Sequence, residues 1–326
     1  MTIAAALAVA AALACAAATA GCGFGAGASE SGTATLAVTR DYGTRSLLDA
    51  VDHDPAASET VLRLLDRDAQ ITTRYGGGFV QSINGVAGGV QGGRTYDWFF
   101  YVNGSESPVG ATDVRVHAGD RIWWDYRDWT AAMRVPAVVG SWPEPFAQAS
   151  TDPDRRLPVR VECATARSLC DRVADELANA GADAGIERLG SHRAGSERAL
   201  QILVGPWGAI RREPAASLGG PADSGVFATF EPGGSGRFEL VLADPSAEPR
   251  CGYRTDAGLV AAVEGPSGLA AWLVTGTDPP GVRRAAAALD ARDLRDRYAV
   301  AVPPDGRRVA VPVVAGAGGC RGVAVG

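Results

Sequence analysis

The sequence contains no lysine, so all 31 basic side chains among its 326 residues are arginines. Without lysine, a chain cannot form a Schiff base through a side-chain amine or use lysine as a general base. Histidine is also scarce, with three residues, and neither H-E-x-x-H nor G-x-S-x-G occurs. These motifs mark zinc proteases and serine hydrolases. We therefore predict a protein that is not an enzyme and that holds no cofactor.

A strong net charge is absent as well. The formal charge of -6 is mild, which argues against a nucleic-acid partner. Apolar residues make up 46% of the chain, an ordinary share for a globular protein. After residue 20, no apolar run approaches the roughly 20 residues that a bilayer-spanning helix needs. The length is sufficient for about two domains.

The one long apolar segment covers residues 3–20, and the small residues T-A-G at 19–21 lead directly to Cys22. A short apolar segment that ends in small residues is typical of a secretory signal. The small-small-Cys ending resembles a bacterial lipobox, in which the cysteine becomes the new N-terminus and is lipidated. We expect residues 1–22 to be such a signal peptide, with Cys22 as the lipidation site. A plain signal peptide and an uncleaved anchor helix are the alternatives.

Four cysteines lie outside the export segment, all in the second half of the chain. An even number in an oxidising compartment indicates two disulfides, with three possible pairings. Free thiols are an alternative, and the absence of a C-x-x-C spacing argues against a metal site. The four disulfide candidates are Cys163, Cys170, Cys251 and Cys320.

Composition divides the rest of the chain into four segments. Residues 23–32 are rich in Gly, Ala and Ser and indicate a flexible tether. Residues 33–130 form a first predicted domain. Residues 131–156 are rich in proline and indicate a linker. Residues 157–326 form a second predicted domain of unknown function.

The first domain begins with a predicted strand around Leu36. A short helix capped by Ser46 is expected next, with a further helical turn at residues 61–65. The strands predicted after it cover residues 70–74, 79–83, 96–102 and 121–129. One helix laid across a mixed sheet is an α+β pattern.

The second domain contains the best predicted helix, residues 165–180, where apolar residues recur every three or four positions and Gly181 follows. Asp278 caps a second helix that is predicted to end near residue 289. Strands are expected at residues 159–161, 200–204, 226–230, 238–242, 259–263, 271–274, 298–302 and 309–313. This order predicts a separate α/β or α+β domain.

Three stretches of the first domain carry a resemblance to a known family. They are R-Y-G-G-G-F-V-Q-S-I-N-G at residues 74–85, W-F-F-Y-V-N-G at 98–104 and A-G-D-R-I-W-W-D-Y-R at 118–127. In this order and spacing they resemble the transcobalamin C-terminal-like family of secreted bacterial proteins and animal cobalamin carriers. The resemblance covers residues 33–130 only. It implies a β-grasp-like domain of the soluble-ligand-binding type, and it suggests a corrinoid ligand and a role in uptake.

Strand periodicity distributes the aromatic residues over both faces of the sheet. Trp98 and Phe100 share one face of their strand, and Tyr101 lies on the other. Trp124 and Tyr126 likewise share a face of the last strand. A helix covers only one face of so small a sheet, so the other face presents large aromatics. Such a surface marks a ligand or partner site, or contact with the second domain.

These observations lead to a hypothesis of a surface lipoprotein on the extracellular face of the bacterial membrane, or a secreted protein. Its first domain would bind a small-molecule ligand by stacking on the aromatic face, and a membrane transporter component is a second expected partner. The expected ligand-binding residues are Tyr75, Trp98, Tyr101, Asn103, Trp124 and Tyr126. The alternatives are a cell-surface module that binds protein or glycan, and a hydrolase in the second domain.

Overall fold

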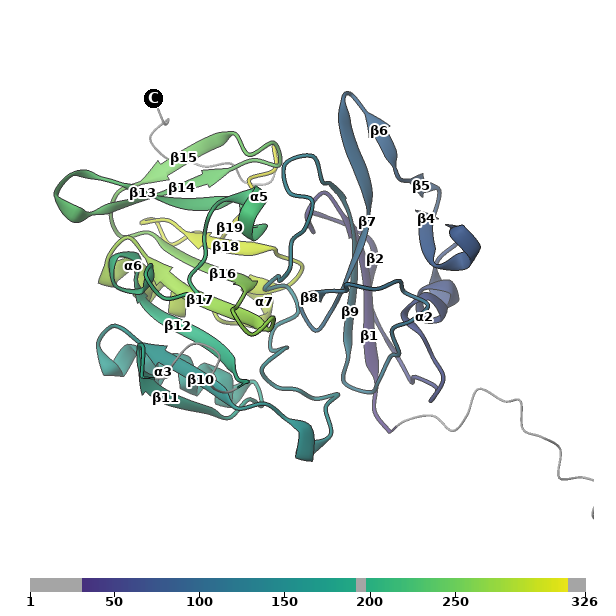
Figure 1. Ribbon diagram of the computed structural model, residues 1–326, viewed down its shortest axis with the longest axis horizontal. Coiled ribbons are helices and arrows are strands. Elements are labelled where there is room, and N and C mark those ends of the chain that lie inside the picture. Colours follow the sequence, from purple (N-terminus) through teal and green to yellow (C-terminus); the bar gives the residue numbers. More distant parts are fainter. Residues whose placement is uncertain (1–30, 192–197, 316–326) are drawn as a thin grey trace, which may run out of the picture.

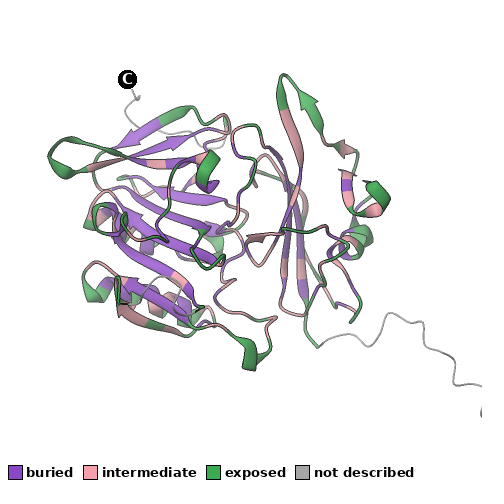
Figure 2. Cartoon of the chain, in the orientation of Figure 1, coloured by how far each residue is buried: buried purple, intermediate pink, exposed green. Residues whose placement is uncertain are grey.

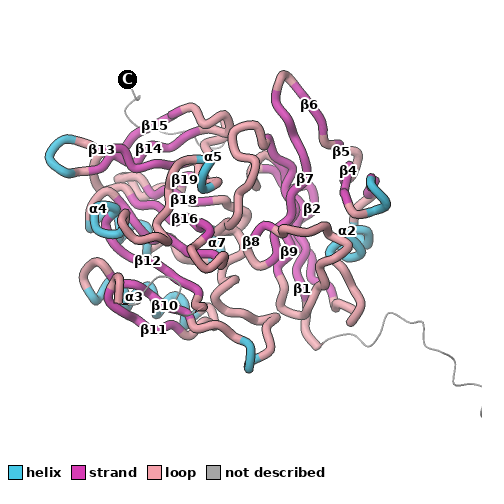
Figure 3. Tube along the Cα trace, viewed as in Figure 1, coloured by secondary structure: helices cyan, strands magenta, loops and turns pink. Residues whose placement is uncertain are grey.

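The computed structural model describes residues 31–191 and 198–315 (Figure 1). The predicted signal peptide, Cys22, most of the tether and Cys320 therefore lie outside the described residues. The described chain is α+β, and strands make up far more of it than helices (Figure 3). This confirms the predicted fold class.

The N-terminal part of the chain is built on a mixed sheet. Its strands are β1 Ala34–Arg40, β2 Arg45–His53, β6 Gly89–Gln91, β7 Arg94–Val102, β8 Ser105–Glu106 and β9 Arg121–Asp128. Their order is β2-β1-β9-β7-β6, and β8 pairs with β7. β1 runs parallel to β9, and the other neighbours are antiparallel. The two aromatic strands, β7 and β9, therefore lie side by side.

One face of this sheet is covered by a helix and a small second sheet. These elements are α2 Val61–Asp68, β3 Ile71–Arg74, β4 Phe79–Ile83 and β5 Val86–Ala87. Thr60 caps α2, because its hydroxyl accepts a hydrogen bond from the backbone N–H of Arg63 at 3.4 Å. Val61, Leu64 and Leu65 of α2 are buried against the sheet. The helical turn predicted at residues 61–65 is confirmed.

The helix predicted to start at Ser46 is wrong, because residues 45–53 form β2. This strand pairs antiparallel with β1, from Ala34 opposite His53 to Arg40 opposite Arg45. The Ser46 hydroxyl donates to the carboxylate of Asp49 at 2.6 Å instead of capping a helix. Short apolar runs fit both the helical period of 3.6 residues and the strand period of two. Pairing with β1 makes this segment a strand.

The C-terminal part contains a seven-stranded sheet with the order β11-β10-β12-β17-β16-β18-β19. Its strands are β10 Val159–Cys163, β11 Ala184–Arg188, β12 Leu200–Pro206, β16 Gly258–Glu264, β17 Ala270–Gly276, β18 Ala299–Val302 and β19 Val309–Val311. β11, β10, β12 and β17 are parallel, and the remaining strands join in antiparallel pairs.

In the described part of the chain, three helices cover one face of this sheet, and a three-stranded sheet with two short helices lies over the other. The helices of this part are α3 Arg167–Asn179, α4 Trp207–Ile210, α5 Pro221–Ser224, α6 Pro279–Ala286 and α7 Ala291–Leu294, and the small sheet comprises β13 Ala228–Pro232, β14 Phe238–Ala243 and β15 Pro249–Tyr253. In β17, Trp272 packs with α3 and α6, whereas Leu273 packs toward the small sheet. Alternate residues therefore serve two separate cores.

Both helices predicted in the C-terminal part are present. Gly181 follows α3 with a φ of 87°, the left-handed conformation that commonly ends a helix. The carboxylate of Asp278 accepts a hydrogen bond from the N–H of Gly281 at 2.9 Å, and so caps α6.

The segment predicted as a linker, residues 131–156, is packed into the molecule. Its regular structure is limited to an isolated β-bridge between Ala137 and Ser105 and a 3-10 turn at Pro153–Arg155. Nevertheless, Trp142 and Phe146 are buried, with ring centroids 5.6 Å and 5.1 Å from that of Trp272. This connecting segment therefore contributes to the core of the C-terminal part.

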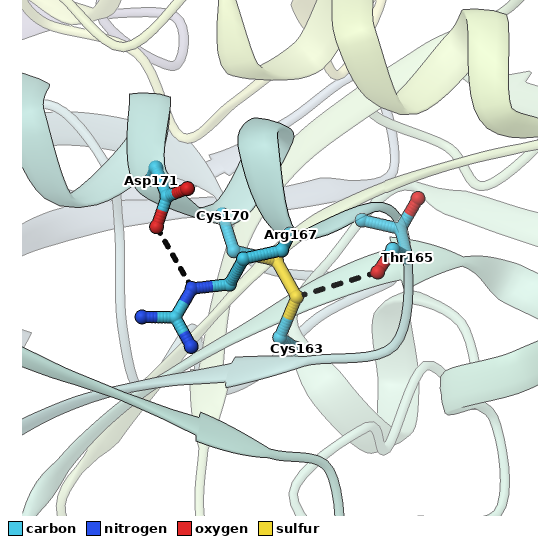
Figure 4. The surroundings of a disulfide bond; sticks show 5 residues. All are labelled: Cys163, Thr165, Arg167, Cys170 and Asp171. Carbon is cyan, nitrogen blue, oxygen red and sulfur yellow. Dashed lines mark hydrogen bonds and ion pairs between the residues drawn. A yellow bond between two sulfur atoms is a disulfide. The ribbon is translucent and has the colours of Figure 1, made fainter.

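A disulfide joins Cys163, at the end of β10, to Cys170 in α3 (Figure 4). Cys251 is disulfide-bonded as well. The expectation of disulfides is thus confirmed, and the structure selects the short-range pairing of Cys163 with Cys170.

Replacing both Cys163 and Cys170 with alanine is expected to lower the free energy of unfolding by about 2–3 kcal/mol. The two residues are seven positions apart, and closing a loop of this size removes that much chain entropy from the unfolded state. Urea denaturation of the double variant and the parent measures the difference. Equal midpoints would show that the bond does not constrain the unfolded chain.

Candidate ligand site where the two parts meet

The second face of the N-terminal sheet is buried against the C-terminal part. The ring of Tyr298 lies 5.7 Å from that of Tyr101 and 5.3 Å from that of Trp123. Tyr42 packs edge-on against Phe227, with ring centroids 5.2 Å apart. Tyr42, Tyr101 and Trp123 belong to one buried cluster with residues of the C-terminal part, and Figure 2 shows buried backbone on strands of both parts. The aromatic residues on this face were expected to mark a ligand site, a partner site or contact with the second domain. The structure shows contact with the second domain.

A buried carboxylate, Asp125 of β9, lies at the centre of this interface. It accepts hydrogen bonds from the Thr39 hydroxyl at 2.5 Å and the Tyr298 hydroxyl at 2.9 Å. The backbone N–H groups of Tyr42 and Gly43 each donate to it at 3.1 Å. Burial raises the pKa of Asp125 to about 7, although these donors and Arg127 favour its charged form.

Arg127, two residues further along β9, is also buried. Its guanidinium lies 3.7 Å from the centre of the Phe99 ring, within cation–π distance. It donates to the carbonyl oxygens of Ala132 at 2.7 Å and Met133 at 3.1 Å. Asp125 and Arg127 therefore attach the sheet to the connecting segment and to Tyr298. Asp125 and Arg127 are both buried and bonded to protein groups, so their role is to hold the two parts together.

Three of the predicted ligand-binding residues belong to the core on the α2 side. The indole N–H of Trp98 donates to the carbonyl of Val86 at 2.9 Å, and the Tyr126 hydroxyl donates to that of Ala87 at 2.9 Å. Trp124 stacks on Phe100 with ring centroids 4.8 Å apart. All three predicted residues are buried. The structure therefore gives Trp98, Trp124 and Tyr126 packing roles.

The other two predicted aromatics lie elsewhere. Tyr101 is fully buried in the interface between the two parts, and its hydroxyl lies 3.3 Å from that of Tyr298. Tyr75 is 86% exposed on a 3-10 turn, with its ring 6.1 Å from that of Phe79. The six predicted residues are therefore not brought together, and no common stacking surface is formed by them.

Asn103 lines a cavity between the two parts. It and Gly104 form the tight turn between β7 and β8, with φ angles of 52° and 81°. A Cβ on Gly104 would lie 2.9 Å from the carbonyl oxygen of Val138, so glycine allows the connecting segment to approach. The Asn103 amide donates to Asp120 at 2.8 Å and its oxygen accepts from the N–H of Arg121 at 2.9 Å.

The cavity beside this turn has a volume of about 420 Å³ and draws its walls from three regions of the chain. The β7–β8 turn contributes one wall, the connecting segment a second, and the strand ends and turn near residues 264–270 a third. Besides Asn103, the principal lining residues are Glu106, Arg134, Glu144, Gln148, Leu157, Glu264 and Leu269. Most of these positions are not adjacent in sequence, and no motif marked them.

Carboxylates outnumber cations in this cavity. Glu106, Glu144 and Glu264 face one arginine, Arg134, which lies 3.6 Å from Glu264. Burial raises the pKa of Glu144, whose carboxylate accepts hydrogen bonds from the backbone N–H groups of Gln148 and Ala149. A site of this kind suits a polar ligand that carries positive charge or many hydrogen-bond donors.

The described residues contain no group of three or more His, Cys, Asp or Glu side chains placed to hold a metal ion. Within residues 31–191 and 198–315, no helix combines the length and apolar character needed to cross a membrane.

In the comparison with known proteins, one family model matches a part of the chain. Residues 58–128 match the model of DUF4430, a domain of unknown function. The match runs from just before α2 to the end of β9, inside the region of the predicted first domain. Among curated proteins, none matches this chain.

One solved structure with a matching portion is that of a protein from Ruminococcus gnavus ATCC 29149 named "putative metal binding protein". The two chains are 13% identical, with a TM-score of 0.25. The alignment covers 30% of this chain and 97% of the other. So slight a likeness supports no inference about fold or function.

Proposed function

We propose that this chain is a non-catalytic binding protein that takes a small polar ligand in the cavity beside the Asn103–Gly104 turn. The main support is that three separate regions of the chain line one cavity, whose walls include three carboxylates. Its volume of about 420 Å³ lies in the range of roughly 300–1,000 Å³ that is common for small-molecule sites. Convergent polar groups with an apolar surround are what such sites use for orientation and specificity.

Export and lipid anchoring are part of this proposal. They are supported by the apolar segment of residues 3–20, the lipobox-like ending at Cys22 and the disulfide between Cys163 and Cys170. Disulfides persist in oxidising compartments outside the cytosol. A binding protein held at the outer face of the membrane would present its ligand to a transporter.

A corrinoid is the ligand class that the resemblance of residues 74–127 to transcobalamin-like domains suggests. A corrinoid is larger than a drug-sized ligand, so this cavity would receive only part of it. The acidic lining favours cobinamide over cobalamin, because cobalamin carries an additional phosphodiester that the carboxylates of Glu106 and Glu264 would repel. The aromatic faces of β7 and β9, being buried, give less support to stacking on the sheet.

The test is calorimetric titration of residues 22–326 carrying Cys22→Ser, first with cobinamide and then with cobalamin. We expect saturable binding at micromolar or lower concentration, with cobinamide tighter. Thr151→Trp, at a half-buried cavity position, is expected to weaken binding at least tenfold by filling the site. Glu264→Gln is expected to weaken it several-fold through loss of a charge.

Glu231→Gln removes the same charge from an exposed position outside the cavity and serves as the matched control. Equal affinity in Thr151→Trp and the parent would place the ligand elsewhere. No detectable heat with either compound at two temperatures would remove the corrinoid and favour a surface module that binds protein or glycan.

A further inference from the structure

A second cavity, of about 460 Å³, lies on the helical face of the C-terminal part, away from the N-terminal sheet. It is bounded by α3, α6 and the loop before β19. Figure 1 shows α3 and α6 on the side of the molecule remote from β1 and β9. Its charged lining residues are Arg172, Asp256, Arg283, Arg284 and Arg308. Four guanidinium groups thus face one carboxylate.

Arg308 is neutralised and fixed within the protein. Its guanidinium donates to the carboxylate of Asp293 at 2.5 Å and to the carbonyl oxygens of Gly306 at 2.7 Å and Ala287 at 2.9 Å. These three bonds hold it as a rigid part of the wall, and Asp293 balances its charge.

Arg284 differs from Arg308, because its Nε atom is buried and has no hydrogen-bond partner. Within the part of the chain that the structure describes, Arg172, Arg283 and Arg284 form no ion pair with a carboxylate. A buried donor on a cation is costly when it is left unsatisfied, and native proteins rarely keep one without a reason. An anion in the cavity would relieve the repulsion among the three arginines, and the terminal nitrogens of the half-buried Arg284 are available to donate to it.

We propose that this cavity binds a phosphate-bearing anion, with Arg284 as the central contact and Arg172 and Arg283 at the rim. Three unpaired guanidinium charges less the charge of Asp256 leave two positive charges, which match a phosphate monoester at neutral pH. The planar guanidinium fork suits phosphate oxygens better than a single point charge does.

The apolar lining residues indicate which kind of phosphate the cavity would bind. Pro280, Ala287 and Val302 form walls that hold no charge. Such a surface favours a phosphate attached to a compact apolar body over free phosphate. The site therefore takes organic phosphates, either as soluble monoesters or as the headgroup region of an anionic lipid. It is separate from the proposed cavity at Asn103 and does not depend on its ligand.

The experiment titrates the mature chain, residues 22–326 with Cys22→Ser, with phenyl phosphate and with inorganic phosphate at constant ionic strength. We expect saturable binding of both, with phenyl phosphate tighter. Arg284→Gln is expected to weaken binding at least tenfold. Arg283→Gln, at an exposed position with little risk to folding, is expected to weaken it about threefold or more.

Arg212→Gln removes one positive charge from an exposed loop outside the cavity and is the control, expected to bind like the parent. Co-sedimentation with vesicles of phosphatidylglycerol or phosphatidylcholine distinguishes a lipid headgroup from a soluble phosphate. A lipid headgroup is identified if the parent binds phosphatidylglycerol vesicles and Arg284→Gln does not. The proposal is overturned if the parent shows no saturable phosphate binding, or if Arg283→Gln and Arg284→Gln bind like Arg212→Gln.

Discussion

Gly43→Ala is expected to lower the free energy of unfolding by roughly 3 kcal/mol or more. Gly43 has a φ of +75°, and a left-handed conformation costs an L-residue about 1–2 kcal/mol. A Cβ at this position would also lie 1.9 Å from the carbonyl oxygen of Asp296, across the interface between the two parts. Relieving that clash requires backbone movement, which typically costs about 1–3 kcal/mol. Urea denaturation followed by tryptophan fluorescence measures the loss.

Gly76→Ala separates the two contributions. Gly76 has nearly the same φ, +73°, but no atom lies within 4 Å of the position that its Cβ would take. Gly76→Ala should therefore lower the free energy of unfolding only by the cost of the left-handed conformation, about 1–2 kcal/mol. If both variants lose the same amount, Gly43 is not held against Asp296 and the parts are not docked as described.

Asp125→Ala is expected to destabilise the protein by about 4 kcal/mol or more at pH 6. The hydroxyls of Thr39 and Tyr298 and the N–H groups of Tyr42 and Gly43 would lose their common acceptor in a buried site. Each buried donor that stays unsatisfied costs about 1–3 kcal/mol. Asp66→Ala, on the exposed side of α2, should change stability by less than about 0.5 kcal/mol. Loss of similar size in both variants would contradict the role of Asp125.

The same carboxyl is expected to make stability depend on pH. The folded pKa of about 7 lies above the ordinary value of 3.8, so between these values the folded protein holds a proton that the unfolded chain has released. Stability is then highest at the acidic end of this window and falls as pH rises through 7. From pH 5.5 to pH 8, the parent should lose about 2 kcal/mol more than Asp125→Asn. Parallel profiles for the two proteins would rule out titration of Asp125 in this window.

The sequence was a good guide wherever local pattern and tertiary packing agree. The two-residue period placed Trp98 and Phe100 on the face opposite Tyr101, as the structure has them. The helix prediction at residues 45–53 was wrong because their apolar spacing suits a helix, whereas pairing with the edge of β1 makes them a strand. Composition alone suggested a linker at residues 131–156, since prolines exclude regular structure but do not prevent burial of Trp142.

The candidate site was far less accessible from sequence. Glu106, Glu144 and Glu264 each look like ordinary surface carboxylates, and only docking of the two parts brings them to one cavity. Asp125 and Arg127 did leave a signal, because charged residues alternate with Trp124 and Tyr126 in a strand whose two faces both require burial. Their partners, Tyr298 and the carbonyls of residues 132–133, are fixed by tertiary structure alone.

The position of Tyr298 has a consequence for how the chain is made. The ribosome completes the N-terminal sheet at residue 128, but the tyrosine that covers Tyr101 and Trp123 is added only near the other end of the chain. At about 5–20 residues per second, this leaves an interval on the order of ten seconds or more. During that time Tyr101 and Trp123 lack the aromatic contact that Tyr298 supplies in the folded protein. A holding factor that binds this face of the sheet until synthesis is complete would prevent premature association.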